Sequence, residues 1–334
     1  MNYSNFIGID ISKKTFDLAL IKGNYTEKMV TAKFPNDHKG IVALEQFIRK
    51  QELVKSETLF CIEHTGLYCR VLSSYLVENQ YAVWLEMPVQ ILRSLGIQRG
   101  KNDQLDAKRI AVYAFTFKDK ARLWQPPREE VQKIHDLLTL RERLVESRKS
   151  ILTPIEELEA TGLSEVATSL KKHCKKSLDA LEKEIEQIEK ELDKIIDKDT
   201  NLKNKYRLAK SVPGIGKITA LSLLYYTNEF TLFPSAKKLA CYCGVAPFAR
   251  ESGTSVKGKS RVSNFANKAM KKLLHMASMA AISSDQELKS YYNRKVAEGK
   301  NKMLVLNAIR NKILHRLCAV IRRETPFYTN FQIA

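Results

Sequence analysis

Two short apolar segments at the start of the chain constrain its fold more than any other feature of the sequence. Residues 6–11 and 16–21 are β-prone runs separated by a short polar turn, which predicts a β-hairpin. A third strand over residues 29–34 would extend it. The pattern then predicts a helix over 39–50, a buried strand over 59–62, a helix from Leu67, a strand over 81–85 and a helix after Asn102. A hairpin meander that leads into alternating strands and helices is typical of an α/β sheet with helices on its faces.

Residues 129–200 have a different character and predict long, charged helices. Apolar side chains recur there at alternating spacings of three and four, which is a heptad seam flanked by Glu and Lys: Leu178, Leu181, Ile185, Ile188, Leu192 and Ile195. We expect a helical hairpin, broken around Thr153–Pro154 and Gly162, that also serves as a dimerisation arm. Packing of the seam against its own domain is the alternative.

The positive charge of the chain is concentrated in its last third. Basic residues outnumber acidic ones, 56 to 37. The net charge is +4 over residues 1–120, −3 over 121–200 and +18 over 201–334. Such a concentration of cations attracts a polyanion, so it favours nucleic-acid binding over a mere solubility face. The expected organisation is an α/β domain over 1–125, a helical or coiled-coil region over 126–203, and a basic, mainly α domain over 204–334 with short loops.

Several classes of protein are disfavoured by the sequence. No apolar run approaches the length of a membrane span, and the N-terminus lacks the pattern of a signal peptide, so we expect a cytoplasmic protein. The cysteines form no CxxC pair and have no histidines at zinc spacing, so we expect them to be reduced and mostly buried: Cys61, Cys69, Cys174, Cys241, Cys243 and Cys318. Gly216-Lys217 is not a Walker A motif, because no glycine stands five residues earlier.

Four carboxylates occupy positions at which they would converge. Asp10 ends the first predicted strand, Glu63 ends the fourth, and Asp103 and Asp106 project from one face of the next helix because they are three residues apart. Convergent carboxylates need cations to remain ionised, and hard oxygen ligands suit Mg²⁺ or Mn²⁺. Two such ions can hold the attacking and departing oxygens of a phosphodiester displacement. Taken singly, Asp10 could form a turn, Glu63 could cap the following helix, and Asp103 could be an N-cap.

Three segments together resemble the signature of the DEDD-type transposases. They are IGIDISK at residues 7–13, EHTGLY at 63–68 and KNDQLDAK at 101–108. This family comprises insertion-sequence transposases and the related pilin-gene invertase Piv, and its N-terminal domain is similar to the RuvC Holliday-junction resolvase, which has an RNase H-like fold. The resemblance covers nearly the whole chain. It implies that Asp10, Glu63, Asp103 and Asp106 bind the metal ions, two Mg²⁺ or Mn²⁺, of a recombinase.

The segment SVPGIGK at residues 211–217 resembles the hairpin of a helix-hairpin-helix element. Gly214 and Gly216 would let the backbone approach a ligand closely, and the amides at the start of the next helix, with Lys217, would face a phosphate. A Pro-Gly turn between two helices explains the same residues.

A second C-terminal segment resembles the family's catalytic serine motif. It includes CGVAP at residues 243–247 and ESG at 251–253, followed by three cations, Lys257, Lys259 and Arg261, and by a helix near Asn267. The family uses a serine before glycine as a nucleophile toward DNA, and Ser252 matches it. A flexible loop would expose this hydroxyl near stabilising cations, whereas an ordinary Ser-Gly turn is the alternative. The same loop contains Ser255, Ser260 and Ser263, and Ala266 stands where family members often have glycine.

These features predict a DNA transposase or site-specific recombinase. Ser252 would attack a metal-polarised phosphate and leave a protein–DNA ester, so that rejoining needs no ATP. The resemblance further implies a structured guide (bridge) RNA that pairs with donor and target DNA. The expected active form is a homodimer or homotetramer associated with the bacterial nucleoid. The alternatives are a metal-dependent junction resolvase or nuclease that uses no serine, and a non-catalytic nucleic-acid-binding protein.

Overall fold

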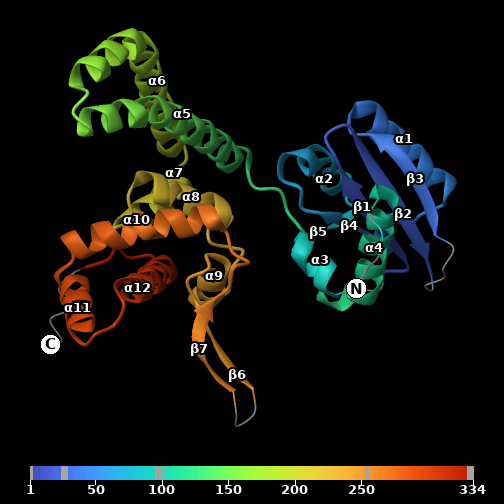
Figure 1. Cartoon of the computed structure of the whole chain (residues 1–334). Coiled ribbons are helices and arrows are strands. Elements are labelled where there is room, and N and C mark those ends of the chain that lie inside the picture. Colours follow the sequence, from blue (N-terminus) through green and yellow to red (C-terminus); the bar gives the residue numbers. More distant parts are fainter. Residues whose placement is uncertain are drawn as a thin grey trace. The chain divides into compact units, whose positions relative to one another are not determined.

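The computed structural model describes residues 3–23, 29–94, 96, 100, 102–252 and 256–328. The chain forms two compact units, Met1–Pro126 and Pro127–Ala334 (Figure 1). The second unit contains both the long helices of the middle region and the basic C-terminal helices. A separate middle domain over 126–203 therefore stays a prediction. Among the described residues, no helix is both long and apolar enough to cross a membrane.

The first unit is built on a five-stranded mixed sheet. Its strand order is β3-β2-β1-β4-β5. The strands are β1 Asn5–Ile11, β2 Thr15–Lys22, β3 Val30–Pro35, β4 Thr58–Glu63 and β5 Ala82–Glu86. The first three strands are antiparallel neighbours, whereas β4 and β5 continue the sheet in parallel from β1. The expected hairpin meander and the alternating units after it are confirmed.

Helices cover both faces of this sheet. They are α1 His38–Lys50, α2 Arg70–Glu78, α3 Pro88–Ser94 and α4 Asp103–Thr116. Successive residues of a strand point to opposite faces: Ile7 packs in the cluster that contains α1 and α2, whereas Phe6 packs in the cluster that contains α4. The helix expected from Leu67 begins at Arg70, because a 3-10 turn over Gly66–Cys69 precedes it. The result is a three-layer unit with a core on each side of the sheet.

The second unit is mainly helical, as expected, but differs from the expectation in two places. Its elements are α5 Glu129–Ala160, α6 Ser164–Lys198, α7 Thr200–Lys210, α8 Lys217–Tyr226, α9 Ala236–Tyr242, β6 Pro247–Ser252, β7 Val256–Val262, α10 Lys268–Ser284, α11 Gln286–Ala297 and α12 Lys302–Arg323. The predicted break at Pro154 is wrong, because α5 continues through it and ends near Gly162, whose φ is +86°. The strands β6 and β7 form a hairpin where only helices and short loops were expected.

The heptad seam of α6 packs within its own chain. Ile188, Leu192 and Ile195 are buried in one cluster with Val131 of α5 and Leu221 of α8. The alternative of packing against its own domain therefore holds for this part of the seam, and the expectation that these residues face a second protomer is wrong. Oligomerisation through the rest of the seam, where Leu181 and Ile185 are only partly buried, stays a prediction.

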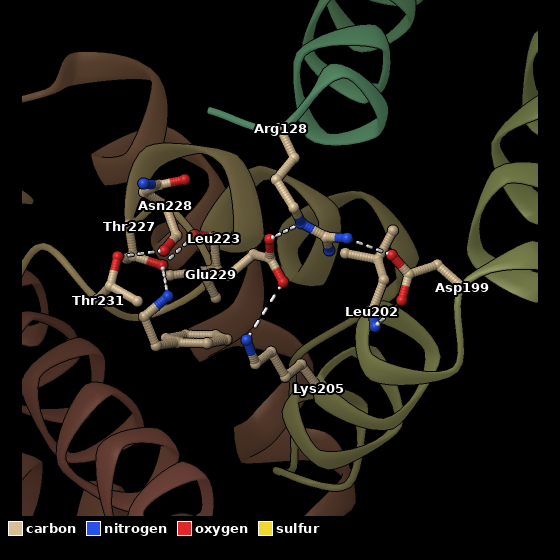
Figure 2. A network of polar contacts seen from close by, with 10 residues as sticks. Arg128, Asp199, Leu202, Lys205, Leu223, Thr227, Asn228, Glu229 and Thr231 are labelled. Atoms are coloured by element: carbon tan, nitrogen blue, oxygen red, sulfur yellow. Dashed lines mark hydrogen bonds and ion pairs between the residues drawn. The ribbon is translucent and has the colours of Figure 1, made fainter. Parts of the chain in front are cut away.

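A network of ion pairs ties the start of α5 to the rest of the second unit (Figure 2). Arg128 Nε donates to Glu229 Oε1 at 2.7 Å, and Arg128 Nη1 donates to Asp199 Oδ2 at 2.5 Å. Lys205 Nζ contacts the second oxygen of Glu229 at 3.2 Å. Burial by itself would raise the pKa of Glu229, but Arg128 and Lys205 outweigh it and lower that pKa. The network thus joins α5, the α6–α7 junction and the turn after α8.

Candidate active site

The strand register places Asp10 and Glu63 side by side at one edge of the sheet, the edge formed by the C-terminal ends of the parallel strands β1 and β4. In the parallel pair of β1 and β4, Ile9 lies opposite Ile62. The next residues are Asp10, one residue before the end of β1, and Glu63, the last residue of β4, so they lie on adjacent strands. Across the antiparallel hairpin, Asp10 lies opposite Asp17. This geometry follows from the order of strands and from the direction of β4.

Helix α4 reaches the same edge because it packs very closely on β1. A Cβ atom at Gly8 would lie 2.1 Å from the Ala111 nitrogen and 2.4 Å from the Ala107 oxygen of α4. Only glycine allows this approach. The first turn of α4 contains Asp103 and Asp106, and its N-cap is Asn102, whose side chain accepts from Leu105 N at 2.7 Å. The alternative in which Asp103 is the N-cap is therefore wrong.

The carboxylates converge electrostatically on Asp10. The pKa of Asp10 is raised to about 6, first by burial and then by repulsion from Glu63, Asp106, Asp103 and Asp17. A carboxyl group responds in this way when like charges lie near it in a partly dehydrated site. The four acids singled out in the sequence, and Asp17 with them, thus lie near enough for the other four to repel the charge of Asp10.

Two basic side chains pair with these acids. Lys33 Nζ lies 3.0 Å from Asp17 and 3.6 Å from Asp103, and Arg109 Nη1 lies 2.6 Å from Asp106. The hydrogen bond to Asp17 is the main cause of a raised Lys33 pKa. Within the described residues, no three His, Cys, Asp or Glu side chains are close enough together to hold a metal ion in this arrangement. The donor set nevertheless fits a hard divalent cation, since all of its ligands are carboxylates.

Glu86 is a further acid at this edge that sequence reasoning missed. It ends β5 and lies opposite Glu63 in the parallel register. Its Oε2 accepts from the Tyr113 hydroxyl of α4 at 3.0 Å, and its Oε1 accepts from Met87 N at 2.7 Å. Glu86 therefore anchors α4 to β5. Its place at a strand end, like that of Asp10 and Glu63, was the signal that could have identified it.

The turn over residues 211–217 joins α7 to α8. Gly214 has a φ of +87°, and a Cβ there would lie 2.2 Å from the Ala277 oxygen of α10. Gly216 is the N-cap of α8. Lys217 Nζ contacts Asp193 at 2.7 Å and donates to the Glu189 carbonyl at 2.8 Å. Gly214 thus serves packing between helices, and phosphate binding by Lys217 stays a prediction that requires it to leave α6.

Ser252 lies at the end of a strand. It is the last residue of β6 and is paired with Val256 of β7. The expectation of a flexible loop is therefore wrong for Ser252 itself, whereas Gly253 and Ser255 lie outside the described residues. The three basic residues predicted to contact nucleic acid lie on β7: Lys257, Lys259 and Arg261. The helix expected near Asn267 is confirmed, since Asn267 caps α10.

Comparison with known proteins identifies the family. Residues 206–293 match the model described as "Transposase IS116/IS110/IS902 family", and residues 7–158 match the model of the DEDD-type transposase. The pilin gene-inverting proteins of Moraxella lacunata and Moraxella bovis are each 30% identical to this chain over 326 residues, which cover 96% of it and 97% of theirs. The chain belongs to this transposase family. The transposase for insertion sequence element IS1111A of Coxiella burnetii is 25% identical over 260 residues, 69% of each chain.

Membership in this transposase family establishes an enzyme that cuts and rejoins DNA. The segment matched over residues 7–158 contains Asp10, Glu63, Asp103 and Asp106, and the segment matched over 206–293 contains Ser252. The transposase therefore has both candidate groups within its family-matched segments. Helix α12 lies beyond them.

Proposed function

We propose that the first unit is an RNase H-like, RuvC-like catalytic domain in which Asp10, Glu63, Asp103 and Asp106 hold two Mg²⁺ or Mn²⁺ ions. The observation that carries this proposal is the geometry: the register of β1 and β4 puts Asp10 beside Glu63, and α4, which begins with Asp103 and Asp106, packs against Gly8 of β1. The raised pKa of Asp10, caused first by burial and then by these acids, agrees with it. The mixed sheet, with the acids at strand ends and on α4, supports the same assignment.

The chain's own residues have definite tasks in such a site. Asp10 and Glu63 are fixed by the sheet, whereas Asp103 and Asp106 are fixed by the packing of α4 on Gly8. Lys33 and Arg109 neutralise Asp17, Asp103 and Asp106 until the acids take up cations. When bound, the divalent ions would polarise the scissile phosphate.

We propose that Ser252 is the nucleophile toward DNA. Its Oγ would form a bond to the phosphorus while the bond from phosphorus to the departing strand oxygen breaks, and the serine proton would end on that oxygen as a hydroxyl. The phosphodiester count is unchanged by this exchange, so a hydroxyl of a new strand can reverse it without ATP. The family resemblance and the serine's place in the segment matched over 206–293 support this role.

The expected partners are double-stranded donor and target DNA and a structured guide RNA. The charge of +18 over residues 201–334 supports polyanion binding by the second unit. The proposal includes a homodimer or homotetramer acting in the cytoplasm at the nucleoid. Sequence selection would rest on base pairing with the RNA, and the protein would contact backbones.

The test of the metal site is strand cleavage by single variants of the full chain. Asp10→Asn, Glu63→Gln and Asp106→Asn should each lose cleavage with Mg²⁺ and with Mn²⁺ by at least about a hundredfold while retaining DNA binding. The control is Asp119→Asn, since Asp119 is an exposed acid of the same unit that does not contribute to the pKa of Asp10. Normal cleavage by two of the three variants would exclude this site.

A further inference from the structure

A buried arginine of the second unit lacks the carboxylate that a buried cation requires. Arg310 of α12 is 5% exposed. Its Nη2 donates to His275 Nδ1 of α10 at 2.7 Å, and its Nε–H has no hydrogen-bond partner among the described residues. Burial lowers the pKa of Arg310, and no acid in the described part of the chain opposes this effect. The guanidinium is thus an uncompensated positive charge inside the protein.

The sequence of the two helices explains why this charge is uncompensated. Neither α10 nor α12 contains an acidic residue. An arginine remains protonated at neutral pH, and burying an unpaired charge is costly. The fold therefore maintains an unfavourable feature that a methionine or leucine at this position would avoid.

Arg316, on the same helix, shows how this fold treats an arginine with a structural role. Its Nη1 lies 2.7 Å from Asp285, and its Nη2 lies 2.6 Å from Glu287. Both carboxylates belong to the junction of α10 with α11. Arg316 is neutralised twice within the chain, whereas among the described residues Arg310 has only a histidine as its partner. The contrast indicates that the anion for Arg310 comes from outside the described chain.

The surroundings of Arg310 favour a phosphate as that anion. Arginine has only donors, so His275 must accept through Nδ1, which orients the guanidinium without neutralising it. The contact lies at the edge of the helix interface, since it is only partly buried. Lys271 and Lys272 lie about one turn before His275 on α10. The planar guanidinium fork can donate two parallel hydrogen bonds to a phosphate or to a carboxylate, and these are the two common anions that it matches best.

We propose that Arg310, positioned by His275, binds a backbone phosphodiester of the nucleic acid at the junction of α10 and α12. The phosphate would supply the missing negative charge, so the cost of the buried cation in the free protein is recovered on binding. Arg310 lies outside both segments matched by the family models, 7–158 and 206–293. The site serves binding and needs neither the carboxylates of the first unit nor Ser252.

The test measures nucleic-acid affinity and stability together in the full chain carrying Arg310→Met. Binding to a labelled DNA duplex, to its single strand and to a structured RNA should be compared over a range of salt concentrations. The affinity for the natural ligand should fall by roughly 10- to 100-fold. The slope of log K against log salt should fall by about 0.9 for a duplex or about 0.7 for a single strand. The nucleic acid whose affinity falls most in Arg310→Met is the one that supplies the phosphate.

Two further measurements separate this role from a structural one and from general charge. The thermal midpoint of the free variant should be unchanged or higher, because an unpaired buried charge has been removed. Lys312→Met, which removes an exposed cation from the same helix, should weaken binding less than threefold. Unchanged affinity in Arg310→Met, or an equal loss in Lys312→Met, would refute the site.

If Arg310→Met fails to fold, the wild-type protein provides the answer. The Nε–H resonance of Arg310 can be assigned by its absence from the spectrum of Arg310→Lys. This resonance should shift when the duplex or the RNA is added. A resonance that stays in place at saturating nucleic acid would overturn the proposal.

Discussion

Replacing Asp10 with asparagine should stabilise the transposase at neutral pH when divalent metal is absent. The pKa of Asp10 rises from 3.8 to about 6 on folding, through burial and the repulsion of Glu63, Asp106 and Asp103. The folded state therefore prefers the protonated carboxyl. This contribution is fully present below pH 3.8 and is lost as the pH rises through about 6. Asparagine has no charge to lose and escapes this penalty.

The size of the effect follows from the change in pKa. A rise from 3.8 to about 6 corresponds to a ceiling of about 3 kcal/mol. Because Asp10 is only partly buried, solvent screening reduces this to about 1–2 kcal/mol. In a unit of this size, that free energy raises the thermal midpoint by roughly 3–10 °C.

The assay is thermal unfolding in EDTA, followed by circular dichroism at about pH 8 and about pH 4.5. Asp10→Asn should unfold above the wild type at the higher pH, and the difference should shrink at the lower pH. Addition of Mg²⁺ or Mn²⁺ should raise the midpoint of the wild type and not that of the variant. A lower midpoint for Asp10→Asn at pH 8, or a difference that is the same at both pH values, would refute the reasoning.

Three other substitutions test the framework around the sites. Gly8→Ala should destabilise the first unit by more than about 3 kcal/mol in urea unfolding and abolish cleavage, because its Cβ would lie 2.1 Å from Ala111 N and must push α4 away. Gly214→Ala should destabilise the second unit by a similar amount and leave the unfolding of the first unit unchanged, since its φ is +87° and its Cβ would meet the backbone of α10. Arg128→Met should cost about 3 kcal/mol at pH 7 because it leaves Glu229 buried without its main partner. Folding lowers the pKa of Glu229 below 4.5, so the ion pair with Arg128 contributes its full stability above pH 4.5, and this contribution is lost as the pH falls through the pKa of folded Glu229. A destabilisation by Arg128→Met that is the same at all pH values between about 3 and 7 would contradict the assignment.

The centre of the sheet could be predicted because β1, β2 and β4 are strongly apolar and buried. Phe6 and Ile7 pack in cores on opposite faces of the sheet. Because both faces of β1 are buried, its sequence is a continuous apolar run bounded by turn residues. The meeting of Asp10 with Glu63 could be expected from their places at strand ends, but their adjacency depends on the pairing of β1 with β4. The close approach of α4 at Gly8 is invisible in the sequence, because a glycine in a strand has several explanations.

The second unit was less predictable for physical reasons. The strands of the β6–β7 hairpin, PFARES and VKGKSRV, lack apolar alternation, so they resemble a polar loop. Pro154 removes one hydrogen bond from α5, yet the helix continues there, and Ile155 beside it is buried. Arg310 is one of many cations in the sequence. Its lack of a carboxylate becomes evident only when α10 and α12 are packed together.

The most direct test of the central claim, a DNA-joining enzyme with a serine nucleophile, is to trap the covalent protein–DNA adduct on a suicide substrate and locate the modified residue by mass spectrometry. Wild-type protein with Mg²⁺ should give an adduct on Ser252. Ser252→Ala and Asp106→Asn should give none, whereas the matched control Ser263→Ala should give as much as the wild type. An adduct that persists in Ser252→Ala, or cleavage that yields only free ends, would contradict the account and favour a hydrolytic nuclease.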